Sequence, residues 1–484
     1  MIGISLAHRV FGDTAMELIP KQKLQDSKFM SNRLFNNILS AWKGVSVQFS
    51  GKRLELSSYL HANEHEPLRT KIADCLEGKG GEVSARSRAA ELGKAYLGLN
   101  DEGRYKYLQL LINEFGIDHD KVRTSAEALF SDLSDERRSE VEEELRHCLT
   151  PPYLTLLTQF NALPQGIKFL VDLRTDVMRL SAKHPELSQL NEVLYTQLSS
   201  WFDIGFLDLQ KINWNAPASL LEKLIEYEAV HRVESWDDLQ HRLGENRRCF
   251  AFFHPRMPKE PLIFVWVALV DKISDNVTTL LDVSQQETTN DQPATAIFYS
   301  ITSAQKGLAG VSLGNFLIKR VVDELKRELP SLEQFATLSP IPGFSKWLQS
   351  RVESSEEEVF TAEERDVINN ASNGTAEDLV THHEWLSDES ICTVMQNPMQ
   401  RLVAKYILNE KRKNGTASNP VAHFHLSNGA KFERINWMAD LSDHGKSQSY
   451  GMMINYLYDL DEIDKNHEEY IENGKIALSK SIQK

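Results

Sequence analysis

Residues 310–314, GVSLG, match the pattern G-x-S-x-G, in which the serine can be the nucleophile of a hydrolase. A nucleophile of this kind lies on a sharp turn directly after a strand. Here the apolar run that predicts the strand ends near Thr302, and the segment SAQKGLAG follows before the pattern is complete. The helical pattern NFLIKRVVDELKREL then begins near Asn315. This spacing is unfavourable for a nucleophile elbow at Ser312.

The same glycines suit a second kind of chemistry. A glycine-rich loop that leads into a helix N-terminus presents backbone N–H groups and partial positive charge to an anion. Lys319 and Arg320, early in the predicted helix, are candidate counter-charges. From the residues alone, three interpretations stay open: a phosphate-binding loop, a plain glycine turn and a nucleophile elbow.

Ser339 ends the predicted strand QFATLS and is followed by Pro340 and Pro342. The two prolines fix φ and remove two backbone donors, so the strand cannot continue. The serine is therefore held at a strand end that faces a rigid turn. By itself, a serine in this position is most often structural.

His425 lies in the last turn of a short predicted helix. Asn419 is a good N-cap and Pro420 suits the first helical position, while Asn428 and Gly429 supply the stop. The helix dipole favours a protonated imidazole at this end. We therefore expect His425 to be biased toward the cationic form and to be a plausible proton donor near neutral pH.

The elements that position these residues fall into two halves. Residues 1–200 space their apolar side chains as amphipathic helices do, and we expect a helical bundle for packing or oligomerisation. Residues 201–484 place strands between helices, and we expect a mixed α/β (α+β) domain. The predicted strands are CFAFFH (249–254), PLIFVWVALV (261–270), TAIFYSIT (295–302), QFATLS (334–339) and AKFERINWMA (430–439). The second and third are apolar enough to be central.

The composition is that of an ordinary globular protein, with 41% apolar and 25% charged residues. The net charge of −15 argues against nucleic-acid binding, which needs Lys and Arg to neutralise phosphates. We expect no membrane partner, because no apolar run has the length of a membrane span and the N-terminus has neither signal nor transit composition. The four cysteines lack metal-ligand spacing, so we expect a reducing compartment, by default the cytoplasm.

Three long segments resemble the malonyl-CoA decarboxylase family. They are AIFYSITSAQKGLAGVSLGNFLIKRVVDELKRELPSLEQFATLSPIPGFSKWL, CFAFFHPRMPKEPLIFVWVAL and NPVAHFHLSNGAKFERINWMADLS, and the similarity spans roughly residues 200 to 460. The resemblance implies a helical oligomerisation domain over 1–200, a catalytic domain similar to the GNAT acyltransferases over 201–484, and a homotetramer.

The resemblance also assigns roles to residues. It implies Ser339 and His425 as the catalytic serine and histidine, with Ser300 and Tyr458 as further candidates for orienting the pair or binding the substrate. It makes Ser312 a loop residue and not a nucleophile. The implied acyl-CoA-binding stretch is Ala309, Gly310, Val311, Ser312, Leu313, Gly314 and Asn315.

The implied reaction converts malonyl-CoA to acetyl-CoA and carbon dioxide. The carboxylate electrons move into the thioester carbonyl, so the reaction needs hydrogen-bond donors and a dry site but no cofactor and no metal ion. We expect His425 to protonate the enolate. Ser339 would be hydrogen-bonded to His425, relaying a proton or holding the carboxylate, with no covalent intermediate. A GNAT-type CoA-dependent acyltransferase is the main alternative, followed by a hydrolase at Ser312 and a non-catalytic acyl-CoA sensor.

Overall fold

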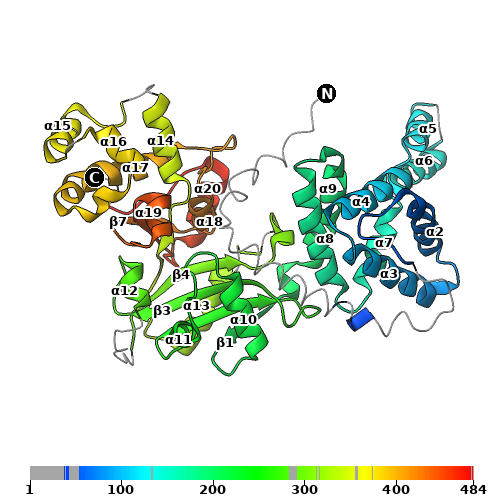
Figure 1. Cartoon of the computed structure of the whole chain (residues 1–484), viewed down its shortest axis with the longest axis horizontal. Coiled ribbons are helices and arrows are strands. Elements are labelled where there is room, and N and C mark those ends of the chain that lie inside the picture. The colour runs from blue at the N-terminus through cyan, green and yellow to red at the C-terminus, as the bar shows by residue number, and fades with distance from the viewer. Residues whose placement is uncertain are drawn as a thin grey trace. The chain divides into compact units, whose positions relative to one another are not determined.

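The computed structural model describes residues 38–482, apart from 39, 43–53, 132–133, 283–291, 312, 315–316, 355–357, 373 and 481. The chain divides into two compact units, residues 1–203 with 305–311 and residues 204–304 with 312–484. Element labels are those of Figure 1. The division falls inside the G-x-S-x-G stretch: its first residues group with the helices and its last with the sheet.

Within its described residues, the first unit contains helices and no strands. At its centre the ring of Phe169 lies 4.9 Å from Phe160, 5.2 Å from Trp42 and 6.0 Å from Tyr96, measured between ring centroids. Edge-to-face contacts of this kind fix the packing of the helices that carry them. The helices are α2 (His65–Leu76), α3 (Gly81–Leu97), α4 (Asp101–Phe115), α5 (His119–Leu129), α6 (Asp135–Cys148), α7 (Tyr153–Asn161), α8 (Gly166–Ser181) and α9 (Ser188–Trp201).

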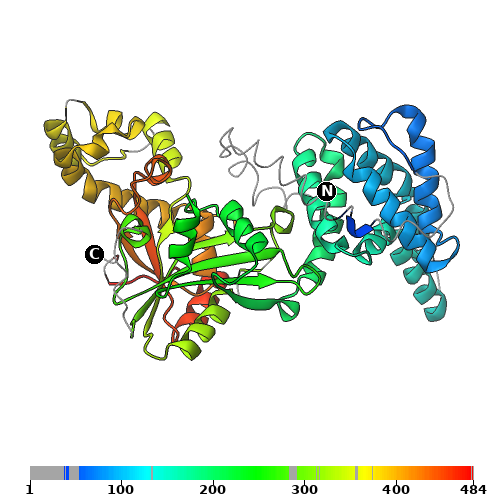
Figure 2. The ribbon, with the colours of Figure 1, turned by 60° about the horizontal axis from the view of Figure 1, so that its bottom comes forward.

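The second unit is built on a mixed eight-stranded sheet with the order β1-β2-β3-β4-β5-β8-β6, in which β7 also pairs with β8. Only the β4–β5 pair is parallel among these strands. Figure 2 shows the late strands, orange to red, continuing the layer of the green strands. The strands are β1 (Asp208–Ile212), β2 (Arg247–Phe253), β3 (Pro261–Val270), β4 (Thr295–Ser303), β5 (Gln334–Thr337), β6 (Ser339–Pro340), β7 (Lys431–Asn436) and β8 (Met453–Leu457).

All five predicted strands are present, and the predicted α+β fold class is confirmed. The strand 261–270 has its predicted ends, whereas the segment 334–339 is interrupted at Leu338 and forms two short strands, β5 and β6. The second continues one residue beyond its predicted end, to Pro340, which pairs with Met453 of β8. Two strands were not predicted, β1 and β8. The second omission matters, since β8 pairs with β5, β6 and β7 and brings distant parts of the chain together.

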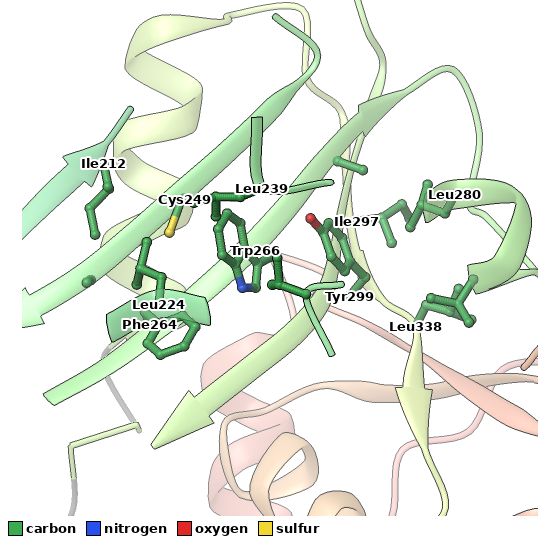
Figure 3. Close-up of a cluster of buried hydrophobic side chains, with 14 of the residues drawn as sticks. Ile212, Leu224, Leu239, Cys249, Phe264, Trp266, Leu280, Ile297, Tyr299 and Leu338 are labelled. Atoms are coloured by element: carbon green, nitrogen blue, oxygen red, sulfur yellow. The ribbon is translucent and has the colours of Figure 1, made fainter. Parts of the chain in front are cut away.

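Alternation along the strands gives the sheet two covered faces. One face carries the apolar core of Figure 3. The core includes Cys249, Phe264, Trp266, Ile297 and Tyr299 from the sheet and Leu338 between β5 and β6. Helices α10 (Ala218–Tyr227), α11 (Trp236–Arg242) and α12 (Val277–Leu281) contribute Leu224, Leu239 and Leu280. On the opposite face, Arg320 of α13 (Leu317–Glu328) lies over the ring of Phe252, and α18 (Pro420–Ser427) lies against Tyr456.

The remaining helices of this unit follow the Ser339 segment or end the chain. They are α14 (Phe344–Ser354), α15 (Ala362–Ala371), α16 (Ala376–Thr381), α17 (Glu389–Asn409), α19 (Asp443–Ser449) and α20 (Ile463–Asn473).

Candidate active site

The helix that carries His425 has the caps that the sequence predicts. Asn419 Oδ1 accepts a hydrogen bond from the Ala422 N–H at 2.9 Å, which satisfies one free donor at the helix start. Gly429 follows the helix with φ of +81°, a conformation that favours glycine. These two ends place His425 in the last turn, where it is 3% exposed.

The structure brings Ser339 and His425 together. Ser339 Oγ lies 3.0 Å from His425 Nε2 and donates its proton to Thr337 Oγ1 at 2.8 Å. Thr337 Oγ1 also accepts from the Tyr456 N–H at 3.1 Å, so Thr337 is itself held in place. A hydroxyl has one proton to give, so Ser339 can only accept from the imidazole in this arrangement. Nε2 is therefore the ring nitrogen that carries the proton.

Tyr458 completes the set of hydrogen bonds. Its hydroxyl lies 2.8 Å from His425 Nδ1, which accepts when Nε2 is protonated. Burial raises the pKa of Tyr458 well above its ordinary value, so the phenol keeps its proton and remains a donor. The hydrogen bonds therefore run from Tyr458 to His425, from His425 to Ser339 and from Ser339 to Thr337.

The expectation that His425 is biased toward the cationic form is wrong for the protein alone. The imidazole stacks on the ring of Tyr456 at 4.8 Å between centroids, with Phe424 at 5.1 Å on its edge. Burial lowers the pKa of His425 to about 3. A helix end stabilises a cation by only about 1 kcal/mol, and the loss of hydration outweighs it. The imidazole is neutral at physiological pH.

The turn after Ser339 is tied to the helix of His425 by one side chain. Asn419, whose Oδ1 caps the helix, donates through Nδ2 to the Pro342 carbonyl at 2.8 Å. The Tyr406 hydroxyl donates to the same carbonyl at 3.1 Å. A single asparagine thus fixes both members of the serine–histidine pair relative to each other.

Ser300 does not join this pair. Trp266 is opposite Ser300 and Val267 is opposite Phe298, so Tyr299 is an extra residue in β4, a β-bulge. The bulge interrupts the alternation of side chains and turns Ser300 to the face of Trp266, which is the core face. There Ser300 Oγ donates to the buried carboxylate of Glu228 at 2.8 Å, and Trp266 Nε1 donates to the same carboxylate at 2.8 Å. Sequence alternation could not show this, because it assumes an unbroken strand.

Of the predicted acyl-CoA stretch, Ser312 and Asn315 lie outside the described residues. Gly310 has φ of +85° and Gly314 lies so close to Phe424 that an added Cβ would come within 2.3 Å of its ring. Both positions therefore need glycine for reasons of their own. Strand β4 ends at Ser303 and a 3-10 turn, Lys306–Leu308, follows, so the stretch does not leave the strand as a nucleophile elbow does.

Lys319 was predicted as a counter-charge for a bound anion. It forms an ion pair with Asp464 at 2.6 Å between Nζ and Oδ1, so its charge is already balanced.

The metal ligands and membrane spans that the sequence does not predict were also sought in the structure. Across the described ranges, no three side chains of His, Cys, Asp or Glu gather as ligands for a metal ion. None of the described helices has both the length and the apolarity to cross a bilayer.

Sequence reasoning missed Thr337 and Tyr456, which contact the pair. The signal was the two-residue period of strands. Thr337 lies two residues before Ser339, and Tyr456 lies two residues before the candidate Tyr458. Residues two apart on an extended segment share a face, so each known candidate pointed to its neighbour.

Known proteins resemble this chain along most of its length. The family profile "Malonyl-CoA decarboxylase C-terminal domain" matches residues 205–484, and "Malonyl-CoA decarboxylase N-terminal domain" matches residues 115–202. Mitochondrial malonyl-CoA decarboxylase from Anser anser anser is 40% identical over 82% of this chain and 83% of its own length. The Rattus norvegicus protein of the same name is 38% identical over 86% and 85%.

Solved structures give the same result. The crystal structure of malonyl-CoA decarboxylase from Rhodopseudomonas palustris has a TM-score of 0.79 at 38% identity and covers 87% of this chain and 99% of its own. The enzyme of that name from Agrobacterium vitis has a TM-score of 0.78 at 35% identity, with 86% and 98% covered. The profiles, the relatives and the structures all lead to one conclusion: the chain belongs to the malonyl-CoA decarboxylase family.

Proposed function

We propose that Ser339 and His425 carry the conversion of malonyl-CoA to acetyl-CoA and carbon dioxide, the reaction for which the family is named. The observation that supports this assignment is the 3.0 Å contact between Ser339 Oγ and His425 Nε2, made by two buried side chains 86 positions apart. Burial of such a polar pair costs free energy unless its hydrogen bonds are made within the protein or the pair has a role in function. The rings of Tyr456 and Phe424 lie against the imidazole, and burial of this kind favours decarboxylation by removing water from the carboxylate.

His425 takes up a proton when the substrate binds. His425 is neutral in the protein alone, because burial lowers its pKa to about 3. A malonyl carboxylate placed beside the imidazole raises that pKa, since an opposite charge favours the charged form. Substrate binding therefore takes up one proton onto His425. Carbon dioxide then leaves as a neutral molecule, and the negative charge moves onto the thioester enolate.

Ser339 relays this proton. Nε2 is already 3.0 Å from Ser339 Oγ, so the path from the imidazole to the enolate carbon runs through the serine hydroxyl. As Ser339 gives its proton to the carbon, it receives the Nε2 proton, which leaves acetyl-CoA and a neutral imidazole. Because Nε2 carries a proton, it cannot act as the base that would make Ser339 a nucleophile. No acyl-enzyme forms in this mechanism.

We assign Tyr458 as the residue that orients the imidazole through Nδ1, and residues 309–315 as the acyl-CoA loop. The left-handed backbone of Gly310 supports the second assignment, because it lets the main chain approach a ligand closely. Ser300 supports the core through Glu228, and we assign it no contact with the substrate.

The test is to mix the purified protein with malonyl-CoA and to follow acetyl-CoA and carbon dioxide together. Ser339→Ala and His425→Asn should each lower kcat by about a hundredfold or more, the usual loss for a removed proton-transfer group. Both variants should still bind coenzyme A in a calorimeter. Mass spectrometry that traps an acyl group on Ser339 would contradict the mechanism.

Other products would point to the alternatives. Free malonate with coenzyme A would mean thioester hydrolysis and would return attention to Ser312. Transfer of the acyl group to an amine without carbon dioxide would favour the acyltransferase. Binding without turnover would favour a sensor.

We also propose a homotetramer in a reducing compartment, the cytoplasm. Helix α5 buries none of its residues within the chain and α6 buries only Val141, which leaves apolar side chains such as Phe130 available to a second copy. All four cysteines are free, and three of them are buried, which suits reducing conditions. Fractionation of cells is needed for the compartment, because the named vertebrate relatives are mitochondrial.

A further inference from the structure

Arg174 of α8 is a buried cation whose contacts are all neutral. The residue is 4% exposed, and Nη1 donates to the carbonyl oxygens of Gly307 at 2.7 Å and Ala309 at 2.8 Å. Nε donates to Asn191 Oδ1 at 3.2 Å, and the guanidinium lies 5.1 Å from the ring centroid of Tyr195. Within the described part of the chain, no carboxylate forms an ion pair with Arg174.

A buried charge without a counter-ion is costly, and a neutral amide could hold a carbonyl oxygen equally well. Burial lowers the pKa of Arg174, yet a guanidinium keeps its proton in proteins. The charge is therefore present beside the loop, and Glu192 offsets it only through space, without an ion pair. An anion bound at the loop would supply a closer counter-charge.

The contacts of Arg174 also decide which groups the loop presents. The carbonyls of Gly307 and Ala309 are tied to Arg174, and that of Gly310 accepts from the Tyr195 hydroxyl at 3.4 Å. The N–H groups of the neighbouring residues are used in turns within residues 305–311. The Gly310 N–H, in contrast, has no backbone acceptor among the described residues. With its carbonyls drawn toward the helix, this loop offers a donor and not an acceptor, as an anion site requires.

The loop rests directly on the backbone of α8. A Cβ added at Gly307 would come within 1.8 Å of the Val171 carbonyl oxygen and 2.9 Å of Thr175 Oγ1. Glycine is therefore required for the loop to approach the helix closely enough for Arg174 to reach it. The position of the loop is set by the helical unit.

We propose that Arg174 positions the acyl-CoA loop and supplies positive charge for the diphosphate of coenzyme A. It is a positioning residue, since it contacts the loop and acts on the ligand through it. The proposal rests on the assignment of Ala309, Gly310 and Val311 to the acyl-CoA loop.

The test compares two substrates with the same malonyl thioester. Malonyl-CoA carries the diphosphate, whereas malonyl-S-N-acetylcysteamine lacks it. In Arg174→Gln, the KM for malonyl-CoA should rise about tenfold, the loss expected for a charged hydrogen-bonding group. Its kcat, and kcat/KM for the short thioester, should stay within about twofold of wild type. Arg174→Lys keeps the charge but loses the planar set of guanidinium donors, so its KM for malonyl-CoA should lie between those of wild type and Arg174→Gln.

Arg179→Gln is the matched control, because Arg179 lies on the same helix and forms its ion pairs, among the described residues, with Asp101 and Asp176. It should leave the KM for malonyl-CoA unchanged. An unchanged KM in Arg174→Gln would overturn the proposal. An equal loss with both substrates would also overturn it, since that result would assign the side chain to folding alone.

A second variant guards against misfolding. Gly307→Ala keeps Arg174 but moves the loop from α8, and it should raise the KM for malonyl-CoA while sparing the short thioester; loss with both substrates would contradict the proposal. Failure of the wild type to release carbon dioxide would sink the proposed function instead. In that case, calorimetry with coenzyme A alone decides, and an affinity about tenfold weaker in Arg174→Gln would uphold the role of Arg174.

Discussion

At the scale of single residues, burial decides the chemistry of His425. The imidazole has hydrogen bonds on both nitrogens and an aromatic ring on one face, but it has no carboxylate partner in these contacts. It differs in this way from the histidine of a hydrolase triad, which an acid holds and stabilises as a cation. A neutral histidine that charges only when an anionic substrate arrives fits a decarboxylase.

The lowered pKa of His425 predicts a dependence of stability on pH. The unfolded chain takes up a proton on this residue near pH 6.5, whereas the folded protein does so only near pH 3. Stability from this group is therefore present above pH 6.5 and is lost as the pH falls toward 3. The loss should reach about 2 kcal/mol at pH 5.

His425→Gln removes this titration. Urea unfolding should be measured at pH 7.5 and pH 5.0. Between these two values, the free energy of unfolding should fall by about 2 kcal/mol less in the variant than in wild type. The same fall in both proteins would mean that the imidazole is already charged in the folded protein.

We expect the hydroxyl of Thr337 to contribute to turnover through the two hydrogen bonds that it accepts. Thr337→Val keeps the shape of the side chain but removes the acceptor for the Ser339 hydroxyl and for the Tyr456 N–H. We expect kcat to fall by about tenfold to a hundredfold, with KM little changed, because the serine loses its orientation. Thr337→Ser retains the hydroxyl and should recover most of the rate. Equal rates in the valine and serine variants would exclude a role for the hydroxyl.

At the scale of elements, we expect the cap of α18 to affect both stability and turnover. Asn419→Ala removes the bond to Ala422 and the bond to Pro342, and it should cost about 1–3 kcal/mol of stability. Because both partners of the pair depend on this residue, kcat should fall by about tenfold or more as well.

Asn276 provides a matched comparison. It caps α12 by accepting from the Thr279 N–H at 3.0 Å and donates to the Met438 carbonyl at 3.1 Å, the same two kinds of bond in the same unit. Asn276→Ala should cost similar stability, measured by thermal unfolding, and leave kcat near wild type. If both variants lost activity equally, the effect of Asn419 would be one of stability alone.

The elements also explain what the sequence could predict. The strand 261–270 is continuously apolar and the helix of His425 has strong caps at both ends, so each was predicted from local signals. Strand β8 was missed because MINYL is short and its partners lie far away in the chain. The contact between Ser339 and His425 depends on that strand, since Tyr456 and Tyr458 hold the pair. The residue types were visible in the sequence, but their approach came from long-range pairing.

At the scale of the whole molecule, we expect assembly through the helices α5 and α6. Phe130, directly after α5, is 91% exposed, an unusual state for a large apolar side chain unless it is covered by a partner. Phe130→Asp should weaken the tetramer without changing the helical content. Light scattering should give four times the 55.2 kDa chain mass for wild type and a smaller mass for the variant.

Phe206→Asp is the comparison, because Phe206 is 63% exposed in the sheet unit. It should leave the mass unchanged. A wild-type protein that runs as a single chain would end this prediction.

The extra residue in β4 has a consequence for how such a protein can evolve. Deletion of Tyr299 would restore regular alternation, and Ser300 and Thr302 would keep Trp266 and Phe264 as their partners and stay on the core face. The carboxylate of Glu228 would then keep its hydroxyl donors, while the core would lose one large buried ring. The loss or gain of a residue at the bulge therefore leaves the contacts that follow it in place. We therefore expect related proteins to vary in length at this one position of β4 while a hydroxyl side chain stays opposite Trp266.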